Sequence, residues 1–104
     1  MKKAIGIVVL GLLWYNVAKA EYYVKGHVPC GFILENKDDD KNKLMVVSWV
    51  NGYTTAKNYV TEDKVGENVD LDSTYHAVVK YCRDNPLKGL HNAAESIYFQ
   101  MSTK

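Results

Sequence analysis

The side chains best suited to chemistry are two histidine–carboxylate pairs. His76 follows Asp72 by four residues, and His91 precedes Glu95 by four, so each pair can meet on one face of a helix. Metal binding or acid–base catalysis would need these pairs to converge on further ligands or on a nucleophile. The sequence has no H-E-x-x-H, C-x-x-C, glycine-rich phosphate loop or G-x-S-x-G motif. We therefore expect surface pairs and a protein that is not an enzyme.

Three consecutive aspartates, Asp38 to Asp40, form the second candidate. A calcium loop of the EF-hand type needs oxygen ligands at alternate positions, a central glycine and a distal glutamate, and this spacing is missing. Asp39 or Asp40 is better explained as the cap of a helix, where a carboxylate accepts hydrogen bonds from free backbone N–H groups. We expect no metal and no cofactor.

Cys30 and Cys82 are the only cysteines of the chain. A metal site or a catalytic thiol would need further His or Cys at ligand spacing, whereas export to an oxidising compartment favours a disulfide. By the chain-entropy model, closing a loop of roughly 50 residues contributes about 4 kcal/mol. A chain this short has a marginal hydrophobic core, so such a bond could decide whether it folds.

Export is predicted from residues 1–20. Lys2 and Lys3 precede an apolar run, and Ala18-Lys19-Ala20 is typical of a signal-peptidase site. The alternative, a membrane anchor, would need about 20 apolar residues, and this run has about eleven. We expect a single helical domain over residues 21–104, periplasmic or secreted, with no stable membrane insertion after cleavage.

Charge argues against two classes of partner. The chain has 13 basic and 12 acidic residues, and loss of Lys2, Lys3 and Lys19 leaves 10 basic residues against 12 acidic ones. A slightly acidic chain is a poor ligand for nucleic acid or for anionic membrane surfaces. The partner we expect is a protein, and a second copy of the chain stays open as an alternative.

The apolar pattern predicts where the helices lie. A central helix over residues 43–60 carries an apolar stripe at helical spacing, made of Val46, Trp49, Val50, Tyr53, Ala56 and Val60. Gly52 interrupts this helix, and close approach of another helix or a bend would explain it. Residues 30–34 predict a short helix.

Two further helices follow a polar connector. The first is predicted to have Asp72 as its cap and Leu71 as a hydrophobic staple, and its buried face would carry Tyr75 and Cys82. The next would begin at Pro86 with Asn85 as its cap, and its stripe would be Leu87, Leu90, Ala94, Ile97 and Met101. The fold class is therefore all-α, a small orthogonal bundle of three long helices and a short one stapled by one disulfide. The predicted core residues are Trp49, Gly52, Tyr53, Tyr75 and Pro86.

Tyrosine is over-represented for a chain of this length, with eight residues in all. Aromatic side chains with a polar tip suit surfaces that are buried only part of the time. Tyr59, Tyr81 and Tyr98 lie beside the predicted stripes, which makes them candidates for a partner-binding face. A half-buried structural role is the alternative for each.

Four segments resemble known families of small exported proteins. They are Cys30 with Phe32, the segment from Trp49 to Tyr53, the segment from Tyr81 to Pro86, and the segment from Leu90 to Ala94. The first three segments resemble the HdeA/HdeB-type periplasmic helical proteins, and the last three are similar also to the Rap1a/Tai immunity proteins. The first resemblance implies an acid-stress chaperone that prevents aggregation of envelope proteins. The second implies a protein that binds and blocks a toxic cell-wall amidase, and another envelope role remains a third alternative.

Overall fold

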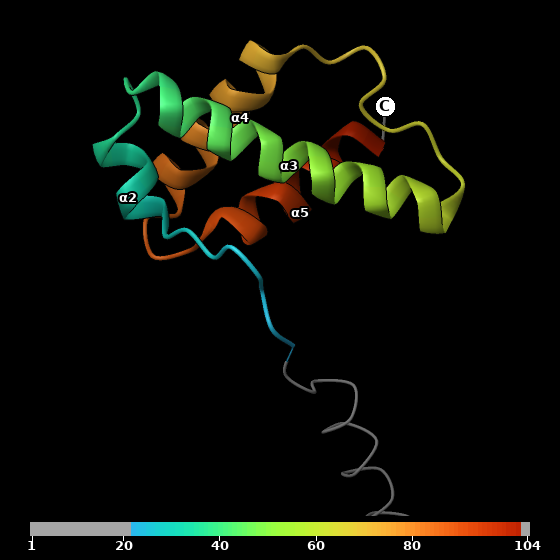
Figure 1. The fold of residues 1–104 in the computed structure, drawn as a ribbon, viewed down its shortest axis with the longest axis horizontal. Coiled ribbons are helices and arrows are strands. Elements are labelled where there is room, and N and C mark those ends of the chain that lie inside the picture. The colour runs from blue at the N-terminus through green and yellow to red at the C-terminus, as the bar shows by residue number, and fades with distance from the viewer. Residues whose placement is uncertain (1–21, 103–104) are drawn as a thin grey trace, which may run out of the picture.

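The computed structural model describes residues 22–102, which form four helices (Figure 1). They are the short α2 (Cys30–Glu35) and the longer α3 (Asp40–Thr61), α4 (Leu71–Asp84) and α5 (Leu90–Ser102). No strand occurs in this part of the chain, so the prediction of an all-α bundle with three long helices and one short one is confirmed. None of these helices is both long and apolar enough to cross a membrane. The predicted leader, residues 1–20, lies outside the described residues.

The predicted disulfide joins α2 to α4. Cys30 and Cys82 are both fully buried, and their Cα atoms lie 4.9 Å apart. Beside it, two backbone hydrogen bonds tie the chain before α2 to the loop before α5: Cys30 N–H donates to Lys88 O at 2.9 Å, and Leu90 N–H donates to Val28 O at 2.8 Å. The N-terminal part of the described chain is therefore fixed to the second half both covalently and through its backbone.

The core lies where all four helices meet. Its fully buried side chains include Ile33 of α2, Val46, Val47 and Val50 of α3, Val78 of α4, and Leu90 of α5. Tyr75 belongs to this core, as predicted, whereas Trp49 and Tyr53 are half-buried and pack against its edge. The most buried part of the molecule is thus aliphatic, and the aromatic residues surround it.

The predicted N-cap of α3 is confirmed, and the predicted N-cap of α4 is wrong. Asp39 caps α3 by accepting a hydrogen bond from Lys41 N–H at 2.9 Å, as expected of Asp39 or Asp40. In α4 the cap is Asp70, which accepts from Ser73 N–H at 2.7 Å, and the prediction of Asp72 as cap is wrong. Leu71 is therefore the first residue of the helix, where it is exposed and cannot act as a staple.

The prediction that α5 begins at Pro86 is also wrong. Asn85 ends α4 by donating from Nδ2 to Tyr81 O, and Pro86 lies at the surface instead of in the core. Leu87, expected on the buried stripe, is 99% exposed. The physical reason is the pair of backbone hydrogen bonds to the chain before α2. Because Lys88 O accepts from Cys30 N–H and Leu90 N–H donates to Val28 O, the helix begins only at Leu90.

Two predictions about α3 are wrong. Ala56 and Val60 are exposed because the predicted stripe winds gradually off the core side of a helix that extends past the core. Gly52 is exposed as well, and a Cβ atom built on it would have no neighbour within 4 Å. Within residues 22–102 no other helix approaches Gly52, so the expected close approach of another helix is wrong.

Candidate functional site

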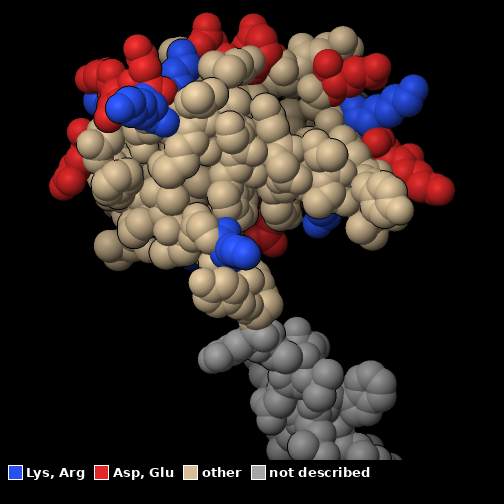
Figure 2. Space-filling model, viewed as in Figure 1, with Lys and Arg blue, Asp and Glu red and all other residues tan. Residues whose placement is uncertain are grey.

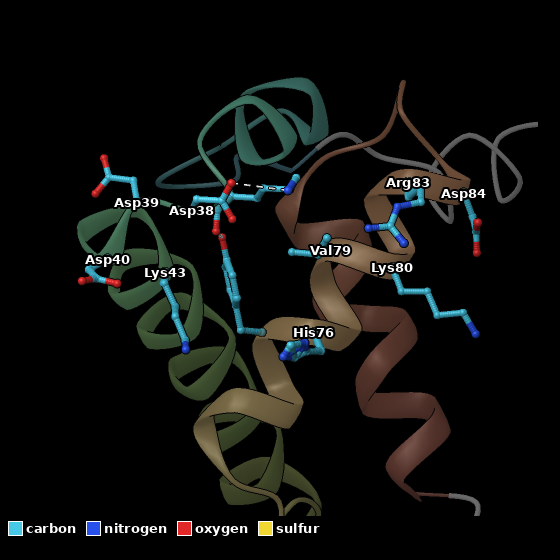
Figure 3. Close-up of a pocket in the computed structure, with 11 residues that line it drawn as sticks. Asp38, Asp39, Asp40, Lys43, His76, Val79, Lys80, Arg83 and Asp84 are labelled. Carbon is cyan, nitrogen blue, oxygen red and sulfur yellow. Dashed lines mark hydrogen bonds and ion pairs between the residues drawn. The ribbon is translucent and has the colours of Figure 1, made fainter.

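A charged groove lies between the α2–α3 turn and α4 (Figure 3). Its volume is about 710 Å³, and its lining side chains include four acidic and four basic ones, namely Asp38, Asp39, Asp40 and Asp84 with Lys37, Lys43, Lys80 and Arg83. Opposite charges balance here, so the groove has no net charge with which to attract an ion. The described residues contain no group of three His, Cys, Asp or Glu side chains able to hold a metal ion.

The polar groups around this groove already serve the fold. Tyr75 donates from its hydroxyl to Lys37 O at 2.7 Å, which holds the α2–α3 turn against α4. Asp72 forms an ion pair with Lys43 of α3, while His76 is exposed, so the expected pairing of Asp72 with His76 is replaced by a contact between two helices. Hydrogen bonding to Asp72 raises the pKa of Lys43 above its usual value. We assign these residues a structural role.

His91 differs from its prediction too. Its ring lies 5.6 Å from the ring of His27, measured between centroids, and it is half-buried. Its Nδ1 atom is buried and has no hydrogen-bond partner in the described part of the chain. His91 is therefore an element of the junction between the N-terminal segment and α5, not a surface partner of Glu95.

The strongest candidate for a binding site is an aromatic cluster between α3 and α5. The rings of Trp49 and Tyr53 stack at 6.0 Å with 12° between their planes, and Tyr53 meets Tyr98 edge-on at 6.3 Å. Lys57 Nζ lies over both tyrosine rings, 5.9 Å from the centroid of Tyr53 and 5.6 Å from that of Tyr98. A cation over aromatic faces is attracted by the ring quadrupoles, so Lys57 holds the cluster's outer side in place.

Two adjoining grooves open from this cluster, and Glu95 lines both. The first, of about 400 Å³, lies between Trp49, Tyr53 and the N-terminal residues Tyr22 and Tyr23. The second, of about 540 Å³, is lined by Lys57, Tyr81, Asn92, Glu95, Ser96, Tyr98, Phe99 and Ser102. We call the two together the aromatic groove. Rings, amides and hydroxyls dominate its lining, which suits contact with apolar and ring side chains of a protein.

The N-terminal segment forms one wall of the aromatic groove through a specific contact. Trp49 donates from its indole Nε1 to Lys25 O at 3.0 Å. The next residue, Gly26, has a φ of +80°, and a Cβ atom there would lie 3.0 Å from the same indole nitrogen. Glycine is therefore required for the chain to turn against the tryptophan.

The three tyrosines expected at a partner-binding face fall in three different settings. Tyr59 is 86% exposed, and neither part of the aromatic groove includes it. Tyr81 is half-buried and lines the groove. Tyr98 is only 8% exposed, and its hydroxyl donates to Asn58 Oδ1 at 3.0 Å, so its side chain has the structural role that was the alternative, while it also lines the groove.

The sequence reasoning missed three aromatic residues of this site. Phe99 is 68% exposed at the groove, and Tyr22 and Tyr23 are exposed beside it. Phe99 could have been found, because it lies off the apolar stripe that contains Ile97 and Met101. Tyr22 and Tyr23 had no comparable signal, since their place depends on a contact between Lys25 and a distant tryptophan.

Comparison of the chain with protein-family models, with curated proteins and with solved structures gives no significant match.

Proposed function

We propose that the protein is a non-enzymatic protein-binding protein that acts outside the cytoplasm, as an acid-stress chaperone that binds unfolded envelope proteins. The observation that carries the proposal is the aromatic groove. Trp49 and Tyr53 lie at the edge of the core, where a loosening of the helices would expose them without unfolding the aliphatic centre, and Phe99 of the same groove is already 68% exposed. Rings near a surface are suited to bind apolar segments of other chains.

Acid acts on the contacts that hold the helix starts. Asp39 and Asp70 cap α3 and α4, and Asp72 links α4 to α3 through Lys43. Hydrogen bonds from the backbone and the side chain of Ser73 lower the pKa of Asp70. A lowered pKa means that the carboxylate stabilises the fold above its ordinary pKa, and that this stabilisation is lost as the pH falls through the folded-state value. Strong acid therefore weakens the start of α4.

Two further features favour loosening over complete unfolding. With all 12 carboxylates protonated, the expected mature chain keeps 10 Lys and Arg charges and gains those of its histidines, so the helices repel one another. The Cys30–Cys82 bond does not depend on pH in this range and keeps α2 attached to α4. The expected acid state is an opened bundle, still stapled, with its aromatic residues exposed.

The test is light scattering by an acid-labile client protein at about pH 2 and at pH 7, with and without the purified protein. We expect suppression of aggregation in acid only. Phe99→Ser should weaken the suppression, because it removes an exposed ring of the aromatic groove. Leu87→Ser is the matched control, since Leu87 is equally apolar and more exposed but lies outside the groove.

Absence of protection in acid would refute the chaperone. Tight binding of one folded enzyme at pH 7, with no effect on unfolded clients, would replace it with the inhibitory role that the resemblance to immunity proteins implies.

A further inference from the structure

The outer face of α3 is free of charge along most of its length. Between Leu44 and Thr61 the only charged residue is Lys57, and Lys57 lies over the rings of Tyr53 and Tyr98 and not on this face. Figure 2 shows the result: a broad area over α3 without Lys, Arg, Asp or Glu, with charged groups gathered near the two ends of the helix. Exposed faces of this extent without charge are typical of interaction surfaces.

Gly52 lies at the centre of this face. At 100° per residue, Met45 and Tyr59 fall within about 20° of Gly52 around the helix, and Ser48 and Ala56 within about 40°. All five residues are exposed. A glycine is unfavourable inside a helix, and a Cβ atom there would have no neighbour within 4 Å among the described residues, so packing among them gives no reason for the glycine. A partner backbone that comes close to the helix at this point would supply the reason.

The residues on either side of Gly52 match in pairs. Ser48 and Ala56 stand four residues away on opposite sides, Met45 and Tyr59 seven, and Leu44 and Val60 eight. Small side chains thus flank the glycine, and large apolar ones follow on both sides. Such a face is complementary to itself when a second helix lies antiparallel to it with its own Gly52 at the crossing point.

The charged residues near the two ends of α3 are consistent with the same antiparallel register. Lys41 and Asp63 stand eleven residues before and after Gly52, and both are exposed. In the antiparallel arrangement Lys41 of one copy lies near Asp63 of the other, and the contact occurs twice. A parallel arrangement would instead place like charges together at both ends.

We infer that two copies of the chain associate through the outer face of α3, antiparallel about Gly52. This partner surface is separate from the aromatic groove, so the inference does not depend on the proposed function. The apolar part of the face, from Leu44 to Val60, is about 24 Å long. A single helix face of this length makes an interface at the small end of the specific ones, whose standard size is about 800 Å² buried per partner. We therefore expect a dissociation constant of roughly micromolar size.

Sedimentation velocity of the purified protein over a concentration series at pH 7 measures this association. Gly52→Ala is the most informative variant, because it should have opposite effects on two quantities. Alanine favours the helix, so the monomer should melt at a higher temperature. The added methyl group separates the two backbones at the crossing, so the dissociation constant should rise about tenfold.

The register has its own test. Lys41→Glu and Asp63→Lys should each weaken association, and the double variant should restore it to within about twofold, because the swapped charges again face each other. Lys80→Glu is the matched control, because Lys80 is exposed on α4 and lies outside α3. A monomer at all concentrations up to about 1 mM, a dimer indifferent to Gly52→Ala, or a double variant without rescue would each overturn the inference.

Discussion

Trp49 donates a hydrogen bond from its indole nitrogen to the backbone oxygen of Lys25, 3.0 Å away. Through this bond the chain before α2 crosses the outer edge of α3 and becomes a wall of the aromatic groove. Gly26, with its positive φ, makes the turn that brings Lys25 to the tryptophan. Trp49 thus fixes the N-terminal segment at the edge of the molecule, while aliphatic residues fill the core.

Substitution of Gly26 by alanine should disturb this wall. A Cβ atom at Gly26 would approach Trp49 Nε1 to 3.0 Å, and the positive φ disfavours any other residue. We expect Gly26→Ala to destabilise the fold by about 1–2 kcal/mol and to shift the fluorescence of Trp49. Gly31→Ala is the control, since a Cβ atom on Gly31 of α2 has no neighbour within 4 Å. Equal effects of the two substitutions in urea unfolding would contradict the assignment.

The disulfide should dominate the stability of the bundle. Cys30 and Cys82 are 52 residues apart in sequence, and a loop of this size contributes about 4 kcal/mol in the chain-entropy model. We expect reductant to lower the urea midpoint of the wild type strongly. The double variant Cys30→Ser/Cys82→Ser should unfold like the reduced wild type and show no response to reductant. An oxidised wild type no more stable than its reduced form would rule out the stapled bundle.

The cap of α4 predicts a specific pH dependence. Asp70→Ala removes the acceptor for Ser73 N–H and should lower the stability of the fold at pH 7. Asp70→Asn keeps an acceptor but cannot titrate, so its stability should fall less steeply than that of the wild type as the pH falls below the ordinary pKa of an aspartate and through the lowered pKa of Asp70. Thermal unfolding across this range is the measurement.

Asn58 is expected to fix the connector between α3 and α4. Its side-chain amide donates to Val65 O at 3.0 Å, while its oxygen accepts from Val65 N–H and from the hydroxyl of Tyr98. Asn58→Ala would leave these groups without their partner at a partly buried site, at a cost of about 2 kcal/mol. Tyr98→Phe, which removes the bond to Asn58 and a longer one of 3.5 Å with Thr61 Oγ1 but leaves both bonds between Asn58 and Val65, should cost about 1 kcal/mol. Hydrogen exchange should quicken at Val65 N–H in the first variant and stay slow in the second.

The helices themselves were largely predictable from the sequence. Periodicity located α3 and α4, export context paired the two cysteines, and the stripe of Leu90, Ala94 and Ile97 located the buried face of α5. These signals are local or follow from simple redox chemistry. They fix helix type and the buried side but not the exact ends.

The errors arise where tertiary contacts override local preference. Pro86 is a good first residue for a helix, yet the bridge between Val28 and Leu90 postpones the helix to Leu90. Gly52 suggested a close contact with another helix, and the described part of the chain has none at this position. The aromatic groove was only partly foreseen, since Tyr81 lines it as a predicted candidate while its wall depends on the bond between Lys25 and Trp49.

Crosslinking tests the central claim, that the aromatic groove binds unfolded protein in acid, most directly. A photoreactive group placed at position 99 in the groove, or at position 87 outside it, is activated at about pH 2 and at pH 7 with an unfolded client present. The account predicts client adducts from position 99 in acid, few from position 87, and few from either position at pH 7. Adducts formed equally from both positions, or none from position 99 in acid, would contradict it.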